Sequence, residues 1–237
     1  MPHVLDTAIW ASLTGPHAHL AEVHGQALRY QPDVTPFVTL RPGHDERAWA
    51  DLAELVGPGA RTVLAGASLS APPGGWEVLD TIDGVQMVDG TLRATADPEA
   101  VPLGPDDVPE MLDLVARTEP GPFRPRALEL GAYVGIRRDG KLIAMAGERL
   151  HPPGWTEISA VCTDPAYRRQ GLATRLIRAV AAGIRDRGET PFLHAAAFNT
   201  TAIRLYESIG FTLRVKTTFM AVQVPGDTPL RTMSNST

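Results

Sequence analysis

Arg168-Arg169-Gln170-Gly171-Leu172-Ala173 is the stretch that decides the predicted fold. It lies between a strand expected over residues 157–162 and a helix expected over residues 171–185. A strand that turns through a glycine into a helix presents free backbone N–H groups and the positive end of the helix dipole, which together bind phosphate. The apolar face of the expected helix repeats at helical spacing through Leu172, Leu176, Ile177, Val180 and Ile184.

The residue types of this stretch strengthen the expectation of a phosphate site. Gly171 and Ala173 let an anion approach the backbone closely, and Arg168 and Arg169 add positive charge. The alternative is a plain helix start beside a solvated cluster of arginines. The chain has no G-x-G-x-x-G turn and no G-x-x-x-x-G-K-[S/T] loop, so neither a Rossmann nor a P-loop nucleotide site is supported.

The pattern Arg168-x-x-Gly171-x-Ala173 matches [Q/R]-x-x-G-x-[G/A], so this part of the chain resembles the GNAT superfamily of acyl-CoA-dependent N-acetyltransferases. The resemblance extends from a helix beginning at Asp106 to Phe219, roughly half of the chain. It implies an α+β fold of the GNAT type, with a mixed central sheet flanked by helices in the order β-α-α-β-β-β-α-β-α-β. A second segment is similar to the family's second signature: Asn199-x-x-Ala202-x-x-x-Tyr206-x-x-x-Gly210-Phe211.

The same resemblance implies acetyl-coenzyme A (acetyl-CoA) as the cofactor and indicates which residues bind it. Asn199 would form a hydrogen bond to the cofactor. The backbone of three strand residues would pair with the pantetheine arm and supply an N–H for the oxyanion, namely Val161, Cys162 and Thr163. The loop would hold the pyrophosphate through Arg168, Arg169, Gln170, Gly171, Leu172, Ala173 and Thr174. No metal is expected.

Acetyl transfer to an amine needs a neutral nucleophile, stabilisation of the oxyanion and a proton for the leaving thiolate. Tyr206 is the candidate acid, because the matching tyrosine of the family faces the thioester sulfur; the alternative is a core aromatic residue. Glu157 is the candidate base, directly or through a water, since a carboxylate in an apolar strand is costly unless it has a role or a partner. It lies fourteen positions before Gly171, where histone acetyltransferases of the family carry a basic glutamate. A glutamate facing the surface is the competing explanation.

Two other reactive side chains are expected to be structural. Cys162 has no predicted basic partner, and a cysteine at a strand end is more often a small buried side chain than a nucleophile. His194 is expected to be a packed or hydrogen-bonded strand residue rather than a base.

Charge and composition exclude several function classes. A formal net charge of −5 and a pI near 5.8 argue against a protein that binds nucleic acid by neutralising phosphates. The single cysteine allows neither an intrachain disulfide nor a cysteine zinc site, and it fits a reducing compartment. No apolar run approaches the ~20 residues that span a bilayer, and the N-terminus lacks the layout of a secretory signal. We expect a cytoplasmic protein with neither nucleic-acid nor membrane partners, and a homodimer is one option for its oligomeric state.

A polar stretch over residues 89–100 divides the expected elements into two parts, residues 1–92 and residues 99–225. In the first part, the order strand, helix, strand over residues 37–65 resembles half of a GNAT domain that has lost its phosphate loop. An accessory helical cap is the alternative. Residues 5–30 predict two helices that meet at Gly15-Pro16, and Asp83-Gly84 predicts a hairpin turn between two short strands.

The acceptor is expected to be a primary amine of a small molecule or a peptide. Its pocket would be built from residues 119–123 and from the first part of the chain, neither of which has a charge pattern that names a substrate. Two other functions stay open at this point: a non-catalytic acyl-CoA sensor, and a transferase for a longer acyl chain.

Overall fold

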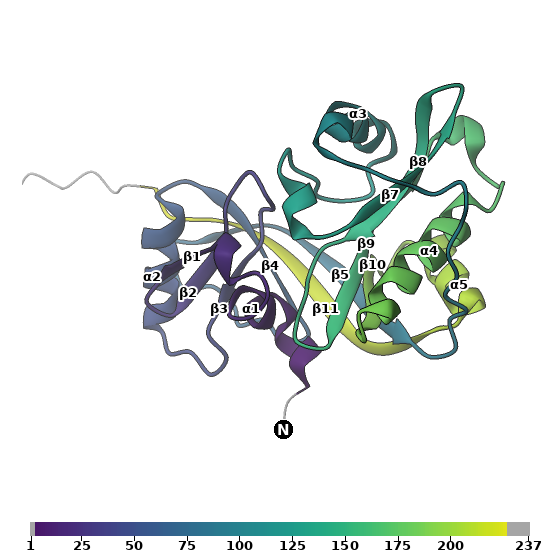
Figure 1. Ribbon diagram of the computed structural model, residues 1–237. Helices are drawn as coiled ribbons and strands as arrows, with labels where there is room; N and C mark the ends of the chain where they lie inside the picture. Colours follow the sequence, from purple (N-terminus) through teal and green to yellow (C-terminus); the bar gives the residue numbers. More distant parts are fainter. Residues whose placement is uncertain (1–2, 227–237) are drawn as a thin grey trace, which may run out of the picture.

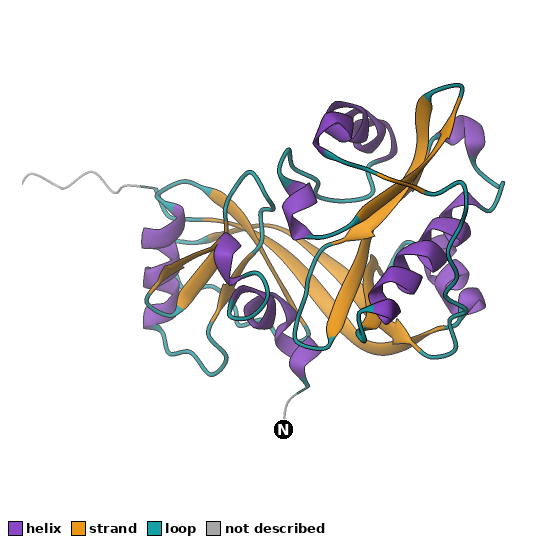
Figure 2. Ribbon diagram, in the orientation of Figure 1, coloured by secondary structure: helices purple, strands orange, loops and turns teal. Residues whose placement is uncertain are grey.

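The chain is built around one large mixed sheet, drawn in orange in Figure 2. The computed structural model describes residues 3–226. Neighbouring strands are antiparallel except β9 and β10, which are parallel. The eight strands follow one another across the sheet as β4 (Arg61–Gly66), β11 (Phe211–Gln223), β5 (Glu77–Asp89), β10 (Thr190–Ala196), β9 (Trp155–Thr163), β8 (Lys141–Glu148), β7 (Tyr133–Arg138) and β6 (Val101–Pro102).

Helices pack on both faces of this sheet (Figure 1). On one face, α4 (Leu172–Asp186) buries its apolar stripe against Ile136 and Ile158, and α5 (Thr200–Ile209) adds Ile209 to the same core. On the other face, α3 (Val108–Thr118) packs against Tyr133 and Met145. The order from β6 to β11 follows the expected GNAT order, with a single 3-10 turn, Ala127–Leu130, in place of the second helix. The α+β GNAT fold expected from the sequence is therefore confirmed.

The first part of the chain contains a second, smaller sheet. Its three strands, β1 (Ala21–His24), β2 (Ala27–Tyr30) and β3 (Val38–Leu40), pack with α1 (Ala8–Leu13) and α2 (Arg47–Val56). Two helices were predicted within residues 5–30, and the second of them is wrong. Residues 18–30 form a 3-10 turn and the β1–β2 hairpin instead. Gly25 has a φ of 53°, which allows the tight turn between the two strands.

Two strands from before residue 92 belong to the large sheet. β5 lies between β10 and β11 and is antiparallel to both, and β4 pairs with the outer edge of β11. Residues on both sides of the predicted boundary therefore share one hydrogen-bonded sheet.

The hairpin predicted at Asp83-Gly84 is wrong, because β5 continues through this position without a turn. A Cβ atom at residue 84 would lie 2.7 Å from the Phe219 ring and 2.9 Å from the Thr217 methyl group. Glycine is needed here because β11 side chains pack directly on the β5 backbone, which is the usual meaning of a glycine inside a strand.

β9 is irregular where it runs beside β10. The two strands pair only over residues 155–158 of β9 and 190–193 of β10. Ala160 has a φ of 52°, and the register with β8 shifts between Met145 and Gly147, which is a β-bulge. The bulge changes the face to which the following side chains point, so Ile158 packs beneath α4 whereas Cys162 packs against α3. The last residues of β9 are left without a partner in β10.

We expect Met87→Ala in β5 to lower the free energy of unfolding by about 2–5 kcal/mol, because this side chain is fully buried in the core shared with α4. Urea unfolding followed by circular dichroism and by tryptophan fluorescence measures the change, and both probes should report the same loss. Leu79→Ala is the matched control on the same strand: its side chain is 38% exposed, so the change should stay within about 0.5 kcal/mol. Equal effects of the two substitutions would contradict the central position of β5.

Candidate active site

A cavity of about 590 Å³ opens where β9 and β10 separate. Of the segment expected near the acceptor, residues 119–122 line this cavity. One side is formed by the β9 and β10 residues Ile158, Ser159, Ala160, Val161, Cys162, Thr163, His194, Ala195 and Ala196. The other end is lined by residues from the first part of the chain and from β11, namely Phe37, Val63, Asp80, Ile82, Phe219 and Ala221.

The loop before α4 has an unusual backbone. It starts with a 3-10 turn, Pro165–Tyr167, which Asp164 caps by accepting a hydrogen bond from the Ala166 N–H at 3.0 Å. Arg169 and Gly171 both take left-handed conformations, with φ of 63° and 74°. α4 then begins without a side-chain cap, so the N–H groups of its first turn are free of side-chain acceptors. A Cβ at Gly171 would meet no atom within 4 Å, which leaves the backbone open to a bulky anion.

The residues expected to bind the cofactor fall into two groups. Five of them line the cavity: Val161, Cys162, Thr163, Arg168 and Asn199. The others form the loop that continues from Arg168 and the first turn of α4, namely Arg169, Gln170, Gly171, Leu172, Ala173 and Thr174. The side chain of Leu172 is buried in the core, so only its backbone N–H can face a ligand.

Asn199 and Tyr206 reach the cavity from α5. Asn199 is the N-cap of this helix, and its Oδ1 accepts a hydrogen bond from the Ala202 N–H at 3.1 Å, which leaves its amide N–H groups to donate elsewhere. Tyr206 also packs edge-on against Phe211, with ring centroids 6.2 Å apart. Burial raises the pKa of Tyr206 to about 12, so the phenol keeps its proton at neutral pH.

Glu157 is fully buried and does not line the cavity. Arg149 donates to both carboxylate oxygens, from Nε to Oε2 at 2.8 Å and from Nη2 to Oε1 at 2.5 Å, and His194 Nδ1 lies 2.7 Å from Oε1. Burial by itself would raise the pKa of Glu157, but Arg149 and His194 outweigh it and lower the pKa to about 2. The alternative of a surface-facing glutamate is wrong.

The lowered pKa links this carboxylate to acid stability. A carboxyl group whose pKa is lower in the folded chain stabilises the fold at pH values above its ordinary pKa of 4.5. That contribution is lost as the pH falls from 4.5 toward 2 and Glu157 is protonated.

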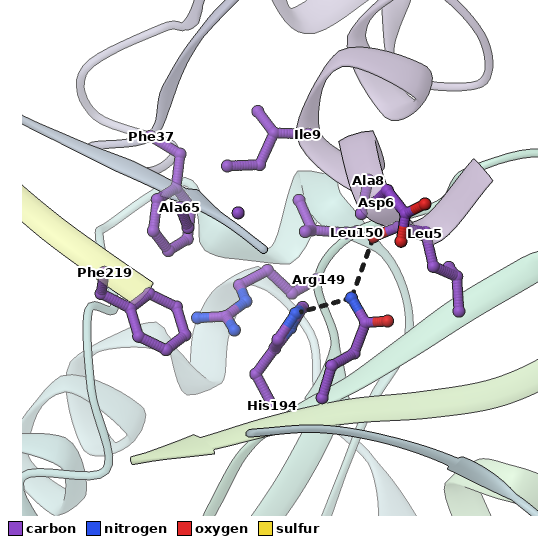
Figure 3. Close-up of a pocket in the computed structure, with 12 residues that line it drawn as sticks. Leu5, Asp6, Ala8, Ile9, Phe37, Ala65, Arg149, Leu150, His194 and Phe219 are labelled. Carbon is purple, nitrogen blue, oxygen red and sulfur yellow. Dashed lines mark hydrogen bonds between the residues drawn. The ribbon is translucent and has the colours of Figure 1, made fainter. Parts of the chain in front are cut away.

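His194 has hydrogen-bond partners at both ring nitrogens, and one of these bonds is drawn in Figure 3. Its Nε2 lies 3.0 Å from Nε2 of Gln86. The amide orientation of Gln86 follows from its other bonds, because its Oε1 accepts from Arg214 and its Nε2 donates to the Leu5 carbonyl at 3.0 Å. Gln86 therefore donates to His194 Nε2, and the proton of the neutral ring resides on Nδ1, which donates to Glu157.

Three partners in this cluster, Arg149, Gln86 and Arg214, were not predicted. Arg149 alone had a signal in the sequence: a buried glutamate needs a cation, and residue 149 follows the strand that pairs with the Glu157 strand. The Arg149 N–H donates to the Glu157 carbonyl at 3.0 Å, which places the two side chains next to each other. Gln86 lies on β5 and Arg214 on β11, and the register between these two strands brings their side chains into contact.

A second, small cavity lies beside Arg149 and His194 (Figure 3). Its volume is about 20 Å³, which is enough for a single water molecule. Asp6 and Gln86 also line it. Arg149 and His194 line both cavities, so they form the wall between the large cleft and the N-terminal 3-10 helix, Val4–Thr7.

Cys162 is a small buried side chain, as the sequence predicts. It is 6% exposed, and burial raises the pKa of its thiol to about 11, which disfavours the reactive thiolate. Within residues 3–226, the structure contains no group of three or more His, Cys, Asp or Glu side chains that could hold a metal ion. No helix in the same range is long and apolar enough to cross a membrane.

Comparisons with known proteins place this geometry in context. Residues 133–220 match the model of the FR47-like protein family. The chain is 44% identical to a crystallised protein from Novosphingobium aromaticivorans that is assigned to the GNAT family of acetyltransferases, with a TM-score of 0.86 over 93% of this chain and 98% of that one. It is also 35% identical to the N-alpha-acetyltransferase RimI of Mycobacterium tuberculosis, over 49% of this chain and 82% of that protein. A GCN5-related N-acetyltransferase from Kribbella flavida is 19% identical, with a TM-score of 0.59 over 92% of this chain and 95% of that one. At this identity the two proteins share the fold only.

We expect Arg149→Met to destabilise the protein by about 3–5 kcal/mol, because it leaves the buried Glu157 carboxylate without its main counter-charge. Adding Glu157→Gln should restore most of the loss, since the neutral amide oxygen can still accept from His194 Nδ1. Urea unfolding of the two single variants and the double variant at pH 7 measures this coupling. Additive losses in the double variant would show that the ion pair contributes little.

Proposed function

The chain belongs to the GNAT family of acetyltransferases, and from that membership we propose that it transfers an acetyl group from acetyl-CoA to a primary amine of a small molecule or a peptide by direct attack. The observation that carries the proposal is the continuity of the site. Arg168 of the loop before α4, the end of β9 that has no partner in β10, and Tyr206 all line a single cavity. The same cavity reaches His194 and apolar residues from the first part of the chain, where the acceptor is proposed to bind.

The residues present fit acetyl-CoA. The pyrophosphate would lie on the free N–H groups at the start of α4, where the open space beside Gly171 and the arginines at 168 and 169 suit an anion. The pantetheine arm would pair with the backbone of residues 161–163, which has no partner in β10, and Asn199 would donate from its amide nitrogen. When bound, acetyl-CoA would supply an activated acyl group.

Tyr206 is proposed as the proton donor to the leaving thiolate. It lines the cavity from α5, and its raised pKa keeps the phenol protonated at the pH at which the amine is attacked. A backbone N–H of residues 161–163 is proposed as the donor to the developing oxyanion, because backbone donors held in a strand need no reorganisation during the reaction.

Glu157 is proposed to act indirectly. The expectation that it is the base meets two obstacles: both of its oxygens have hydrogen-bond partners, and its side chain has no surface in the cavity. A carboxylate with a pKa of about 2 is also a weak proton acceptor. We therefore assign Glu157 the role of holding Arg149 and the neutral ring of His194, both of which do face the cavity.

We expect Gly171→Glu to weaken acetyl-CoA binding by at least about 100-fold, because a carboxylate would occupy the space proposed for the pyrophosphate. Isothermal titration calorimetry measures the affinity. Gly188→Glu is the matched control at the other end of α4, with a φ of 78° and equally open surroundings, and it should bind acetyl-CoA normally. Unchanged binding by the Gly171 variant would remove the loop from the cofactor site.

We expect Tyr206→Phe to lower kcat for acetyl transfer by about 100-fold while the Kd for acetyl-CoA changes by less than about 2-fold, since only the proton donor is lost. Release of free CoA, detected with a thiol reagent across a panel of amines, measures turnover. Tyr133→Phe changes a buried tyrosine outside the cavity and should keep normal turnover. Equal kcat in the wild type and the Tyr206 variant would remove the acid assignment. A chain that binds acetyl-CoA but releases no CoA with any amine would instead be an acyl-CoA sensor.

A further inference from the structure

We infer that the acceptor is an amine with an apolar body and a neutral carbonyl oxygen, of which α-amino amides are the simplest kind, and that free carboxylates are rejected. This inference rests on the proposed function and names the substrate class of the same site. Three features of the acceptor chamber support it: its apolar wall, the unused donors of Arg149, and the sign of the charges that face the chamber.

The wall of the chamber is apolar. Phe37 and Val63 come from the first part of the chain, Ile82 from β5, and Phe219 and Ala221 from β11. Figure 3 shows the rings of Phe37 and Phe219 on the same side of Arg149. An acceptor that fills this space gains free energy by removing its own apolar surface from water, which favours an alkyl or aromatic side chain over a sugar or a polyamine.

Arg149 supplies hydrogen-bond donors that the protein does not use. Its Nε and Nη2 donate to Glu157. Its Nη1 has no hydrogen-bond partner among residues 3–226, and this atom keeps some solvent-accessible surface. The guanidinium carbon lies 5.0 Å from the centre of the Phe37 ring, so one face of the group is covered by that ring and the edge is left for a ligand. A carbonyl oxygen is the simplest partner for these in-plane N–H groups.

The charges around the chamber oppose an anionic acceptor. The positive charge of Arg149 is compensated by the Glu157 carboxylate at hydrogen-bond distance. Asp80 and Glu119 also line the cavity, and neither forms a salt bridge with a residue that the structure describes. Arg168 lies at the opposite end of the cavity, beside Thr163. Asp80 lies opposite Ala221 on the neighbouring strand, so it is at the acceptor end, where the charge of Arg149 is already offset by Glu157. This end is therefore negative on balance, which attracts an ammonium group and repels a carboxylate.

Three probes with the same aromatic body separate these features: phenylalaninamide, 2-phenylethylamine and phenylalanine. The measured quantity is kcat/KM from release of free CoA at saturating acetyl-CoA. A preference is the kcat/KM for one amine divided by the kcat/KM for another. Because the amino groups of the three probes differ in pKa, each preference in the wild type is divided by the same preference in a variant, and the pKa difference then cancels. The expected order in the wild type is amide first and acid last, with the acid at least about 10-fold below the amide.

Two variants assign the preferences to residues. In Arg149→Met/Glu157→Gln, in which the buried charge pair is removed as a unit, the preference for the amide over the plain amine should fall by about 10-fold or more, because a hydrogen bond to a charged donor is lost. In Asp80→Asn/Glu119→Gln, the acid should improve about 3-fold or more relative to the amide. The same relative gain should follow from added salt in the wild type, since both carboxylates are exposed and their repulsion is screened.

Failure of the inference differs from failure of the proposed function. Release of CoA from the wild type with an amide-to-amine ratio that the Arg149 double variant leaves unchanged would overturn the assignment of Arg149. A wild-type preference for phenylalanine over its amide would overturn the exclusion of carboxylates. If acetyl-CoA binds and no amine of any kind releases CoA, the transferase function itself falls, and the inference falls with it.

Discussion

The buried carboxylate of Glu157 is the constraint on which the site depends. An ionised group without access to water is tolerated only when charges and hydrogen bonds offset its lost solvation. Arg149 donates to both oxygens and His194 adds a third hydrogen bond. His194 is in turn held by Gln86, and Gln86 by Arg214. The buried Glu157 carboxylate on β9 thus orients side chains from β5, β10, β11 and the turn after β8.

This cluster joins the two parts of the chain at the place where the chemistry is proposed. Gln86 belongs to β5, and Arg214 also pairs with Asp6 in the N-terminal 3-10 helix. The first part of the chain therefore contributes in two ways. It completes the large sheet through β4 and β5, and it supplies apolar residues to the part of the cavity that is proposed for the acceptor. The boundary between residues 1–92 and residues 99–225 is visible in the sequence, but residues from both sides of it form the large sheet and line the cavity.

The sequence predicted well those features whose cause is local. The turn through Gly171 and the helix α4 were predicted because a glycine turn and an apolar repeat of helical period act within about twenty residues. Asn199 and Tyr206 were found through the resemblance to a family signature, and both line the cavity from α5. The errors in the first part of the chain have the opposite cause. Gly84 resembles a turn glycine in sequence, but the packing of Phe219 from β11 is what requires it, and residues 21–30 form a hairpin because β3 lies beside them.

By itself, then, the sequence determined the family and the order of elements from β6 to β11, and it predicted the glycine turn from Arg168 to Ala173 that leads into α4, because turn and helix patterns are properties of contiguous residues. Only the tertiary structure decided where the Glu157 side chain lies and what it contacts. The glutamate had to have a role or a partner, and burial against Arg149 and His194 supplied the partner and withdrew its oxygens from the cavity. The end of the cavity proposed for the acceptor was also decided by the fold, since its walls come from segments as distant in sequence as Phe37 and Ala221, which meet because β4 and β5 both pair with β11.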